Sequence, residues 1–126
     1  MVRSYAKGYS AERELLHTLS RMGYMTIRAP RSGSISLASP DVIAIKDGKM
    51  LVFEVKWHES AFTIRPEQLA ELEQWSRIGG ATAYVACKIS RKGWKFLTLD
   101  DVTANRGNVG KKFLAEKGMP IESLTS

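Results

Sequence analysis

The sequence predicts a single α/β domain, and three observations support this class. Segments with a helical spacing of apolar residues alternate with short strand-like runs. Two of those runs are joined by Asp47-Gly48, a dipeptide typical of a tight β-hairpin. The chain has 126 residues, a usual length for one domain, and contains no internal repeat or low-complexity tract.

The order of these segments follows from their apolar patterns and turn residues. The predicted elements are a helix over 9–22, a strand over 24–28, a loop over 29–39, hairpin strands over 41–46 and 49–56, a loop over 57–65, a helix over 66–78, strands over 82–87 and 94–99, and a last helix over 109–117. Pro66 suits the first turn of its helix, and Gly79-Gly80 marks the end of that helix. We expect the core over about 3–102, with a short helix and a mobile tail in 103–126.

The composition indicates a basic protein. Lysine and arginine total 19 against 13 acidic residues, a net charge of +6 that is typical of nucleic-acid binders. The single cysteine, Cys87, excludes an intramolecular disulfide and fits a reducing compartment. Residues 1–10 lack the apolar core of a signal peptide, and no run approaches the ~18 apolar residues of a membrane span. We therefore expect a cytoplasmic protein without a membrane partner.

One end of the predicted hairpin carries acidic and basic residues together. A two-residue turn at 47–48 fixes a register that places Asp41 directly opposite Glu54, with both side chains on one face. Lys56 shares the face of Glu54, because side chains in a strand alternate with a period of two. The three side chains are expected to converge.

Two opposed acids in mainly apolar strands need a neutralising partner. Partly buried carboxylates must pair, protonate or bind a cation, and Lys56 offsets only part of the charge. Carboxylate oxygens without a cysteine or histidine cluster favour Mg²⁺ or Mn²⁺ over zinc. Such a cation suits phosphodiester hydrolysis, because it polarises a phosphoryl oxygen and lowers the pKa of bound water. Lys56 would orient the attacking water or stabilise charge on the phosphate, and both roles stay open.

Longer motifs add a family resemblance. Pro40-Asp41 followed by Glu54-Val55-Lys56 matches the PD-(D/E)xK signature of restriction-endonuclease-like nucleases. Over about residues 3–99 the chain resembles one branch of that superfamily, the archaeal Holliday junction resolvases. The other matching segments are Gly8, Ala11-Glu12-Arg13-Glu14-Leu15, Ile27-Arg28, Ser76-Arg77-Ile78-Gly79-Gly80 and Gly93-Trp94-Lys95-Phe96.

The resemblance implies a restriction-endonuclease-like fold, with a central mixed β-sheet flanked by α-helices. It also implies a Mg²⁺-dependent homodimeric endonuclease, with Mn²⁺ able to substitute, that resolves four-way DNA junctions by paired phosphodiester hydrolysis in recombination and repair. Its partner would be junction DNA, with no small-molecule substrate. Carried over to this chain, the catalytic set is Glu12, Asp41, Glu54 and Lys56. The metal ligands would be Glu12, Asp41, Glu54 and the backbone carbonyl of Val55.

Further residues are expected at the DNA and at the dimer interface. The resemblance places Arg13, Arg28, Ser32 and Ser34 near the DNA, and charge alone makes Arg31 a phosphate contact. It also makes 66–78 the dimer helix, with Trp75 and Ile78 as the contact residues.

Simpler interpretations compete with these assignments. Glu12 would also serve as an acid at the positive end of its helix, although it continues an apolar stripe. Glu54 and Lys56 would also form a plain structural ion pair. Rival functions are another nuclease of the superfamily acting on duplex or flap DNA, a non-catalytic junction-binding protein, and, more remotely, a basic RNA-binding or ribosome-associated protein.

Overall fold

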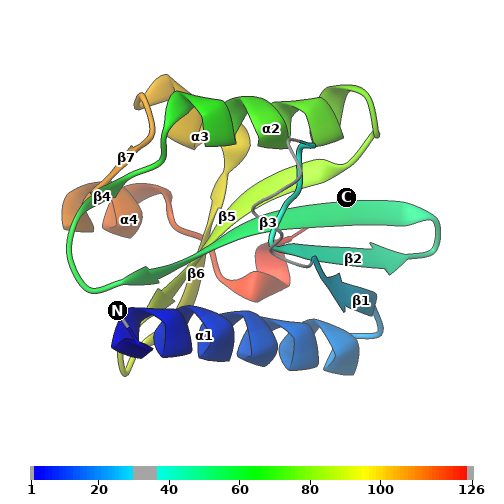
Figure 1. The fold of residues 1–126 in the computed structure, drawn as a ribbon, viewed down its shortest axis with the longest axis horizontal. Coiled ribbons are helices and arrows are strands. Elements are labelled where there is room, and N and C mark those ends of the chain that lie inside the picture. The colour runs from blue at the N-terminus through cyan, green and yellow to red at the C-terminus, as the bar shows by residue number, and fades with distance from the viewer. Residues whose placement is uncertain (1, 30–36, 125–126) are drawn as a thin grey trace.

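A five-stranded mixed sheet lies between helices on both faces (Figure 1). The computed structural model describes residues 2–29 and 37–124. The elements are α1 (Val2–Arg21), β1 (Met25–Arg28), β2 (Val42–Lys46), β3 (Lys49–His58), β4 (Phe62–Thr63), α2 (Pro66–Arg77), β5 (Thr82–Ile89), β6 (Gly93–Thr98), α3 (Leu99–Ala104), β7 (Asn108–Val109), α4 (Lys111–Lys117) and the short 3₁₀ helix η1 (Ile121–Ser123). The predicted α/β class, with a mixed sheet flanked by helices, is confirmed.

The strand order of the main sheet is β1-β2-β3-β5-β6. β3 and β5 run parallel, and the other neighbours pair antiparallel. A parallel pair needs a crossover connection, and here the crossover carries β4 and α2 across one face. β4 and β7 form a separate two-stranded sheet. β3 therefore lies in the middle of the sheet, where both its faces are covered.

The hairpin forms around the predicted turn. Asp47 and Gly48 have positive φ angles of 52° and 76°, as a type I′ turn requires. Lys46 pairs with Lys49, so the predicted register is confirmed along β2. Its last pair joins Val42 to Phe53.

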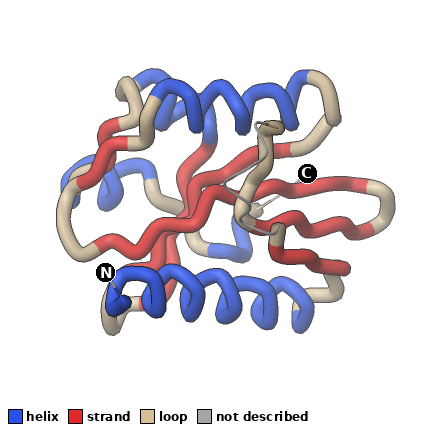
Figure 2. Tube along the Cα trace, in the orientation of Figure 1, coloured by secondary structure: helices blue, strands red, loops and turns tan. Residues whose placement is uncertain are grey.

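Alternate residues of β3 enter two separate cores. Leu51, Phe53 and Val55 pack toward α1, while Val52 packs toward α2. The tube view shows the strands as a layer between the helices (Figure 2). Burial on both sides explains why the hairpin is apolar at successive positions.

Several boundaries differ from those expected from the sequence. α1 begins at Val2 instead of near residue 9, and β3 and β5 extend to His58 and Ile89. α3 lies where a strand end was expected, and its N-cap Thr98 accepts a hydrogen bond from the Asp101 amide at 3.1 Å. β4 and β7 were not predicted. No helix within 2–29 and 37–124 is long and apolar enough to cross a membrane.

The C-terminal part of the chain packs on the sheet. The helix predicted over 109–117 is present as α4. After it, Met119 and Phe96 exchange backbone hydrogen bonds of 2.8 Å in each direction. Leu124 is buried in the core on the α1 side. These contacts join the segment that follows α4 to β6.

Candidate active site

The site lies at the edge of β3 that β2 leaves uncovered. Beyond the Val42–Phe53 pair, the Asp41 amide donates to the Phe53 carbonyl at 2.9 Å, and the Asp41 carbonyl accepts from Ala29 at 3.0 Å. The Asp41 carboxylate then accepts the next β3 amide, that of Val55, at 2.8 Å. The side chain of Asp41 thus binds β3 where the ladder would continue if β2 extended beyond Val42.

This geometry corrects the predicted pairing of Asp41 with Glu54. The register was extended one residue too far, because the ladder ends at Val42. Asp41 is not a strand partner of Glu54; its carboxylate is directed to the backbone of Val55. A carboxylate that accepts a backbone N–H is held in a fixed orientation.

Glu54 and Lys56 lie on the α2 side of β3. The Glu54 side chain is only 12% exposed, and its Oε2 lies 3.7 Å from the Lys56 ammonium. Gln68 of α2 donates to the same oxygen at 3.5 Å. Both distances exceed the 2.7–3.2 Å of a good N–H···O bond, so these contacts are weak. The long ion pair keeps the Lys56 ammonium beside the Glu54 carboxylate without a strong hydrogen bond between them.

Glu12 lies on α1 and faces β1. It is 1% exposed among the apolar residues Ala11, Leu15 and Leu19. The guanidinium of Arg28, on β1, donates to Glu12 Oε1 at 2.6 Å. Because α1 begins at Val2, Glu12 lies well past the first turn, so the interpretation of Glu12 as a helix-end acid is wrong. Its burial within the apolar stripe is confirmed.

Other predicted DNA contacts lie farther from the acids or beyond the described residues. Arg13 is exposed on α1 and forms no ion pair with the acids in the described part of the chain. Arg28 lies over the Tyr9 ring, 4.6 Å from its centroid, as well as against Glu12. Arg31, Ser32 and Ser34 lie outside the described residues.

The predicted dimer residues border a surface hollow at the end of α2. Trp75 donates its indole N–H to the Ala38 carbonyl at 3.2 Å. Ile78, the C-cap residue, is 71% exposed, and Leu37 is 75% exposed. These residues line a hollow of about 330 Å³. The structure thus brings Trp75 and Ile78 to one apolar surface.

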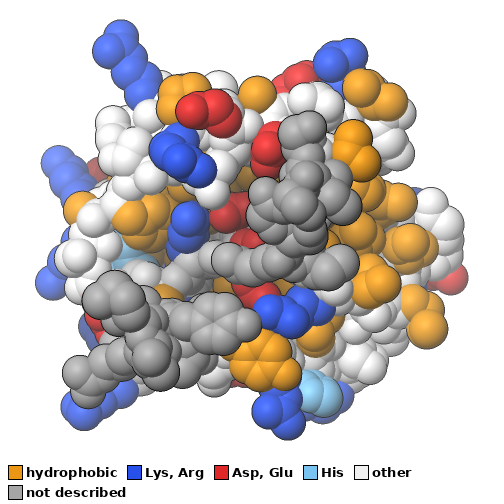
Figure 3. All heavy atoms as spheres, in the orientation of Figure 1, with side chains coloured by type: hydrophobic (Ala, Val, Ile, Leu, Met, Phe, Trp, Pro, Cys, Tyr) orange, Lys and Arg blue, Asp and Glu red, His pale blue; other side chains and the backbone are white. Residues whose placement is uncertain are grey.

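The chemistry of the acids is compatible with a divalent cation. Among residues 2–29 and 37–124, no three His, Cys, Asp or Glu side chains form a ready-made metal cage. Mg²⁺, however, is commonly held by one or two carboxylates, and water and substrate phosphate complete its shell. On the face shown in Figure 3, acidic side chains gather near the centre, between α1 and α2, with Lys and Arg side chains beside them. Asp41 and Glu54 therefore fit that mode of binding.

Cys87 is excluded as a nucleophile. It is fully buried and pairs with Lys56 across β3 and β5. Burial raises the pKa of the Cys87 thiol to about 12, although the nearby Lys56 charge opposes this. A thiol with so high a pKa is inert at neutral pH, and Cys87 acts as a small apolar residue of the core.

Two contacts near the site were missed from the sequence. Gln68 approaches Glu54 from α2, and no local pattern marks that residue. Glu14 accepts hydrogen bonds from Lys88 at 2.9 Å and from Trp94 at 2.8 Å. Partial burial opposes the effect, but these bonds and the charges of Lys88 and Arg21 hold the pKa of Glu14 below its usual value. Glu12 and Glu14 thus bind different strands: Glu12 accepts from Arg28 of β1, and Glu14 accepts from Lys88 of β5 and Trp94 of β6.

Known proteins with a similar sequence or fold point to one family. A model of the archaeal Holliday junction resolvases (Hjc) matches residues 3–126. The crossover junction endodeoxyribonuclease Hjc of Archaeoglobus fulgidus is 36% identical over 92 residues, covering 72% of this chain and 68% of that protein. Its counterpart from Sulfolobus acidocaldarius is 34% identical over 123 residues, covering 94% and 85%.

The fold comparison agrees with the sequence comparison. The solved structure of Archaeoglobus fulgidus Hjc, described as a Holliday junction resolvase from an archaeal hyperthermophile, superposes with a TM-score of 0.81. The match covers 90% of this chain and 96% of that one, at 27% identity.

Proposed function

The chain belongs to the family of archaeal Holliday junction resolvases, and from this membership we infer that it is an endonuclease that resolves four-way DNA junctions. One observation in the site carries the proposal. At the uncovered edge of β3, Asp41 binds the Val55 amide while Glu54 and Lys56 lie on the adjoining positions. Two acids and a lysine at neighbouring positions of the strand pair are the groups that phosphodiester hydrolysis needs, and this supports the proposal.

The chain is proposed to hold Mg²⁺, or Mn²⁺ in its place, through Asp41, Glu54 and the Val55 carbonyl. The N–H and C=O of one strand residue point to the same edge, so the Val55 carbonyl lies on the side where its amide meets Asp41. When bound, the cation polarises a phosphoryl oxygen and lowers the pKa of a bound water. Glu12 is proposed to complete the set from α1, and Arg28 fixes its orientation.

Lys56 has two proposed roles at this site. Its ammonium is held only loosely by Glu54, at 3.7 Å, and it is 31% exposed. It is therefore able to approach a phosphate or a water without breaking a strong bond. It either orients the attacking water or stabilises charge that develops on the phosphate.

DNA is proposed to be recognised by its shape and backbone charge. The net charge of +6 supports attraction to phosphates, and Arg13, Arg31, Ser32 and Ser34 remain proposed contacts. No zinc finger or recognition-helix motif is visible in the sequence. Recognition without base reading suits a junction, whose distinguishing feature is its four arms.

A homodimer is the proposed working form. Large apolar side chains are exposed together on β1 and β2, where Met25 is 78%, Ile27 59% and Ile45 40% exposed. Met25 and Ile45 are strand partners, so they lie side by side. With Trp75 and Ile78 they provide an apolar surface that a second copy would cover. A two-fold dimer places one site on each of two equivalent junction strands.

Introducing a charged side chain into the proposed dimer interface tests whether the protein is a dimer. Ile78→Asp should convert a dimer to a monomer in sedimentation and lower paired cleavage, because the carboxylate would be buried without a partner. Lys117→Asp, on α4, is the matched control and should leave the mass unchanged. A wild-type protein that sediments as a monomer at micromolar concentration would overturn the dimer.

The function is tested with a labelled four-way junction, incubated with and without Mg²⁺ beside its component duplexes. We expect paired incisions in the junction that require the metal, and little cutting of the duplexes. Equal cutting of duplex or flap DNA would favour another nuclease activity. Tight junction binding without cutting, in Mg²⁺ and also in Mn²⁺, would favour the non-catalytic alternative.

A further inference from the structure

A lysine-lined pocket lies beyond the active site, at the far end of β3. It has a volume of about 480 Å³. Its cationic walls are Lys92 in the β5–β6 turn, Lys95 on β6 and Lys111 at the start of α4. His58 and Ile89 border the same space, and we call this site the lysine pocket.

The position of the pocket follows from the alternation of β3. Glu54, Lys56 and His58 lie at every second residue, so their side chains share one face of the strand. His58 stands about 7 Å beyond Lys56 along the strand, at about 3.3 Å per residue. The lysine pocket therefore continues the surface of the active site, and the two lie in line on one face of the sheet.

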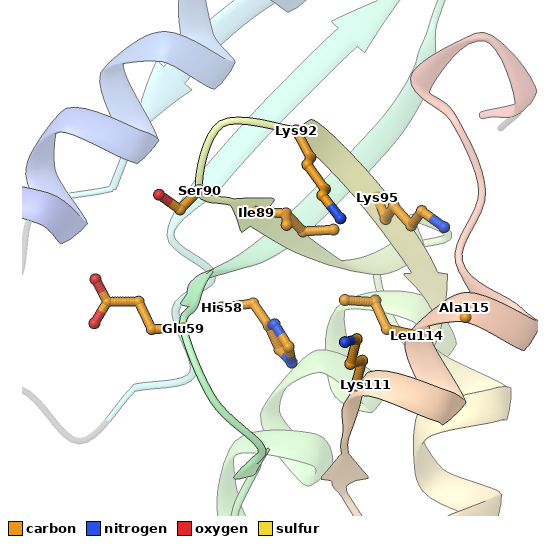
Figure 4. Close-up of a pocket in the computed structure, with 9 residues that line it drawn as sticks. All are labelled: His58, Glu59, Ile89, Ser90, Lys92, Lys95, Lys111, Leu114 and Ala115. Carbon is orange, nitrogen blue, oxygen red and sulfur yellow. The ribbon is translucent and has the colours of Figure 1, made fainter.

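The charge of the pocket is uncompensated within the described part of the chain. There, Lys92, Lys95 and Lys111 form no ion pair, whereas the neighbouring Lys88 binds Glu14 at 2.9 Å. Figure 4 shows the ammonium groups of Lys92 and Lys111 directed into the same space, beside the His58 ring. Glu59 also borders the pocket, but its carboxylate points away from the lysines (Figure 4). Cations gathered without an acid favour an anion between them.

The shape of the pocket favours a nucleotide backbone over a small free anion. Behind the ammonium groups, Ile89, Leu114 and Ala115 form an apolar floor, and Leu114 is 4% exposed. The stem of Lys95 runs against Gly118, where its Cδ would lie 2.8 Å from any added Cβ, so that lysine is held close to the backbone. Cations above an apolar wall match a phosphate attached to a deoxyribose.

We propose that the lysine pocket binds a backbone phosphate of the DNA strand that continues past the cleavage site, and this rests on the proposed function. His58, at the border of the pocket, lies about 7 Å from Lys56 along β3, so the bound phosphate would belong to a nucleotide close to the scissile phosphate. The pocket would thereby fix the distance between the scissile phosphate and the arm of the junction. Lys92 and Lys111 provide the charge, and neither belongs to the catalytic set.

The first test compares two double variants with the same reduction of charge. Lys92→Ala with Lys111→Ala removes charge from the pocket, while Lys49→Ala with Lys112→Ala removes it from exposed positions outside the pocket. For junction binding, the log of the association constant decreases with the log of the salt concentration. In the pocket variant this negative slope should become less steep by about 0.9 for each phosphate that the protein no longer neutralises. The control variant should keep the wild-type slope, and both should unfold at the wild-type temperature.

The second test finds the phosphate itself. Methylphosphonate replaces one charged phosphate at a time on either side of the cut. We expect wild-type affinity to drop at one position close to the scissile phosphate, and the pocket variant to be insensitive to that replacement.

The outcomes separate this inference from the proposed function. If the wild type neither binds nor cuts junctions, the proposed function fails. If the wild type cuts normally and the slope falls equally in both double variants, only net charge matters and the pocket is rejected. A pocket variant that is as sensitive as the wild type at every methylphosphonate position also rejects it.

Discussion

The Glu12–Arg28 pair between α1 and β1 is short and buried, whereas the Glu54–Lys56 pair on β3 is long and more open to solvent. The first has a distance of 2.6 Å with side chains 2% and 28% exposed, and the second 3.7 Å with 12% and 31%. The short pair fixes the relation of a helix to a strand. The long pair holds the Lys56 ammonium only weakly, so this lysine is able to approach a phosphate.

Breaking the acidic side of the loose pair should have the largest effect. Glu54→Gln, and likewise Asp41→Asn, should lower the single-turnover cleavage rate by about 10³-fold, since several kcal/mol of transition-state stabilisation are removed. Junction affinity should stay the same or rise, because negative charge near the DNA is removed. Gel-shift and cleavage assays on the same junction measure both.

The exposed Glu73 provides the control for these variants. Its ion-pair partner among the residues that the structure describes is Arg77, one turn along α2 at 3.3 Å, and both side chains are more than half exposed. Glu73→Gln should cleave at the wild-type rate, because exposed pairs contribute little. Wild-type rates in Asp41→Asn and Glu54→Gln would reject the site.

Removing the basic residue of each pair should lower the free energy of unfolding by different amounts. Arg28→Met removes the partner that lies 2.6 Å from the buried Glu12, at a cost of about 3 kcal/mol, the low end for a buried pair because Arg28 is 28% exposed. Lys56→Met should change the free energy of unfolding by under about 1 kcal/mol while abolishing cleavage. Urea unfolding of both variants, beside the cleavage assay, makes the comparison. Equal decreases in stability would contradict the difference between the pairs.

The smallest expected effect is the pH dependence contributed by Glu14. Its folded pKa lies below the usual 4.5 because Lys88 and Trp94 bind the carboxylate, against the opposing effect of burial. Its contribution is therefore complete above about pH 4.5 and is lost as the pH falls through the lower folded pKa. The side chain is 45% exposed, so we expect under about 1 kcal/mol.

Unfolding measured in urea between about pH 6 and pH 3 tests this contribution. Glu14→Gln should show a shallower decline of stability than the wild type below about pH 4.5, since it removes one carboxylate that the fold keeps deprotonated. Parallel curves for the two proteins would show that Glu14 does not contribute.

The hairpin could be predicted because its turn is encoded locally. Asp47-Gly48 accepts the positive φ angles of a type I′ turn, and this fixes every pair back to Val42. Asp41 was misplaced because no local signal says where a ladder ends. The end of the ladder depends on the Asp41 carboxylate accepting a hydrogen bond from the Val55 amide, a contact between a side chain and the backbone of the neighbouring strand.

Other differences have similar causes. The strands β4 and β7 have two residues each, too few for alternation to be visible. The start of α3 had an available signal, Thr98 followed three residues later by Asp101, which is an N-capping pattern. Glu12 was placed on the apolar stripe by helical spacing alone, but its partner Arg28 is distant in sequence and comes from the fold.

Because Cys87 is buried, we expect the folded native chain not to react with thiol reagents. With a thiol pKa of about 12, on the order of 10⁻⁵ of the groups is thiolate at pH 7, and the side chain is fully enclosed. A cysteine introduced at an exposed position, such as Lys49→Cys or Lys112→Cys, would react with a dye or a spin label without removal of the native one. Distances between two copies, and between protein and labelled DNA, then become measurable on an otherwise unaltered enzyme.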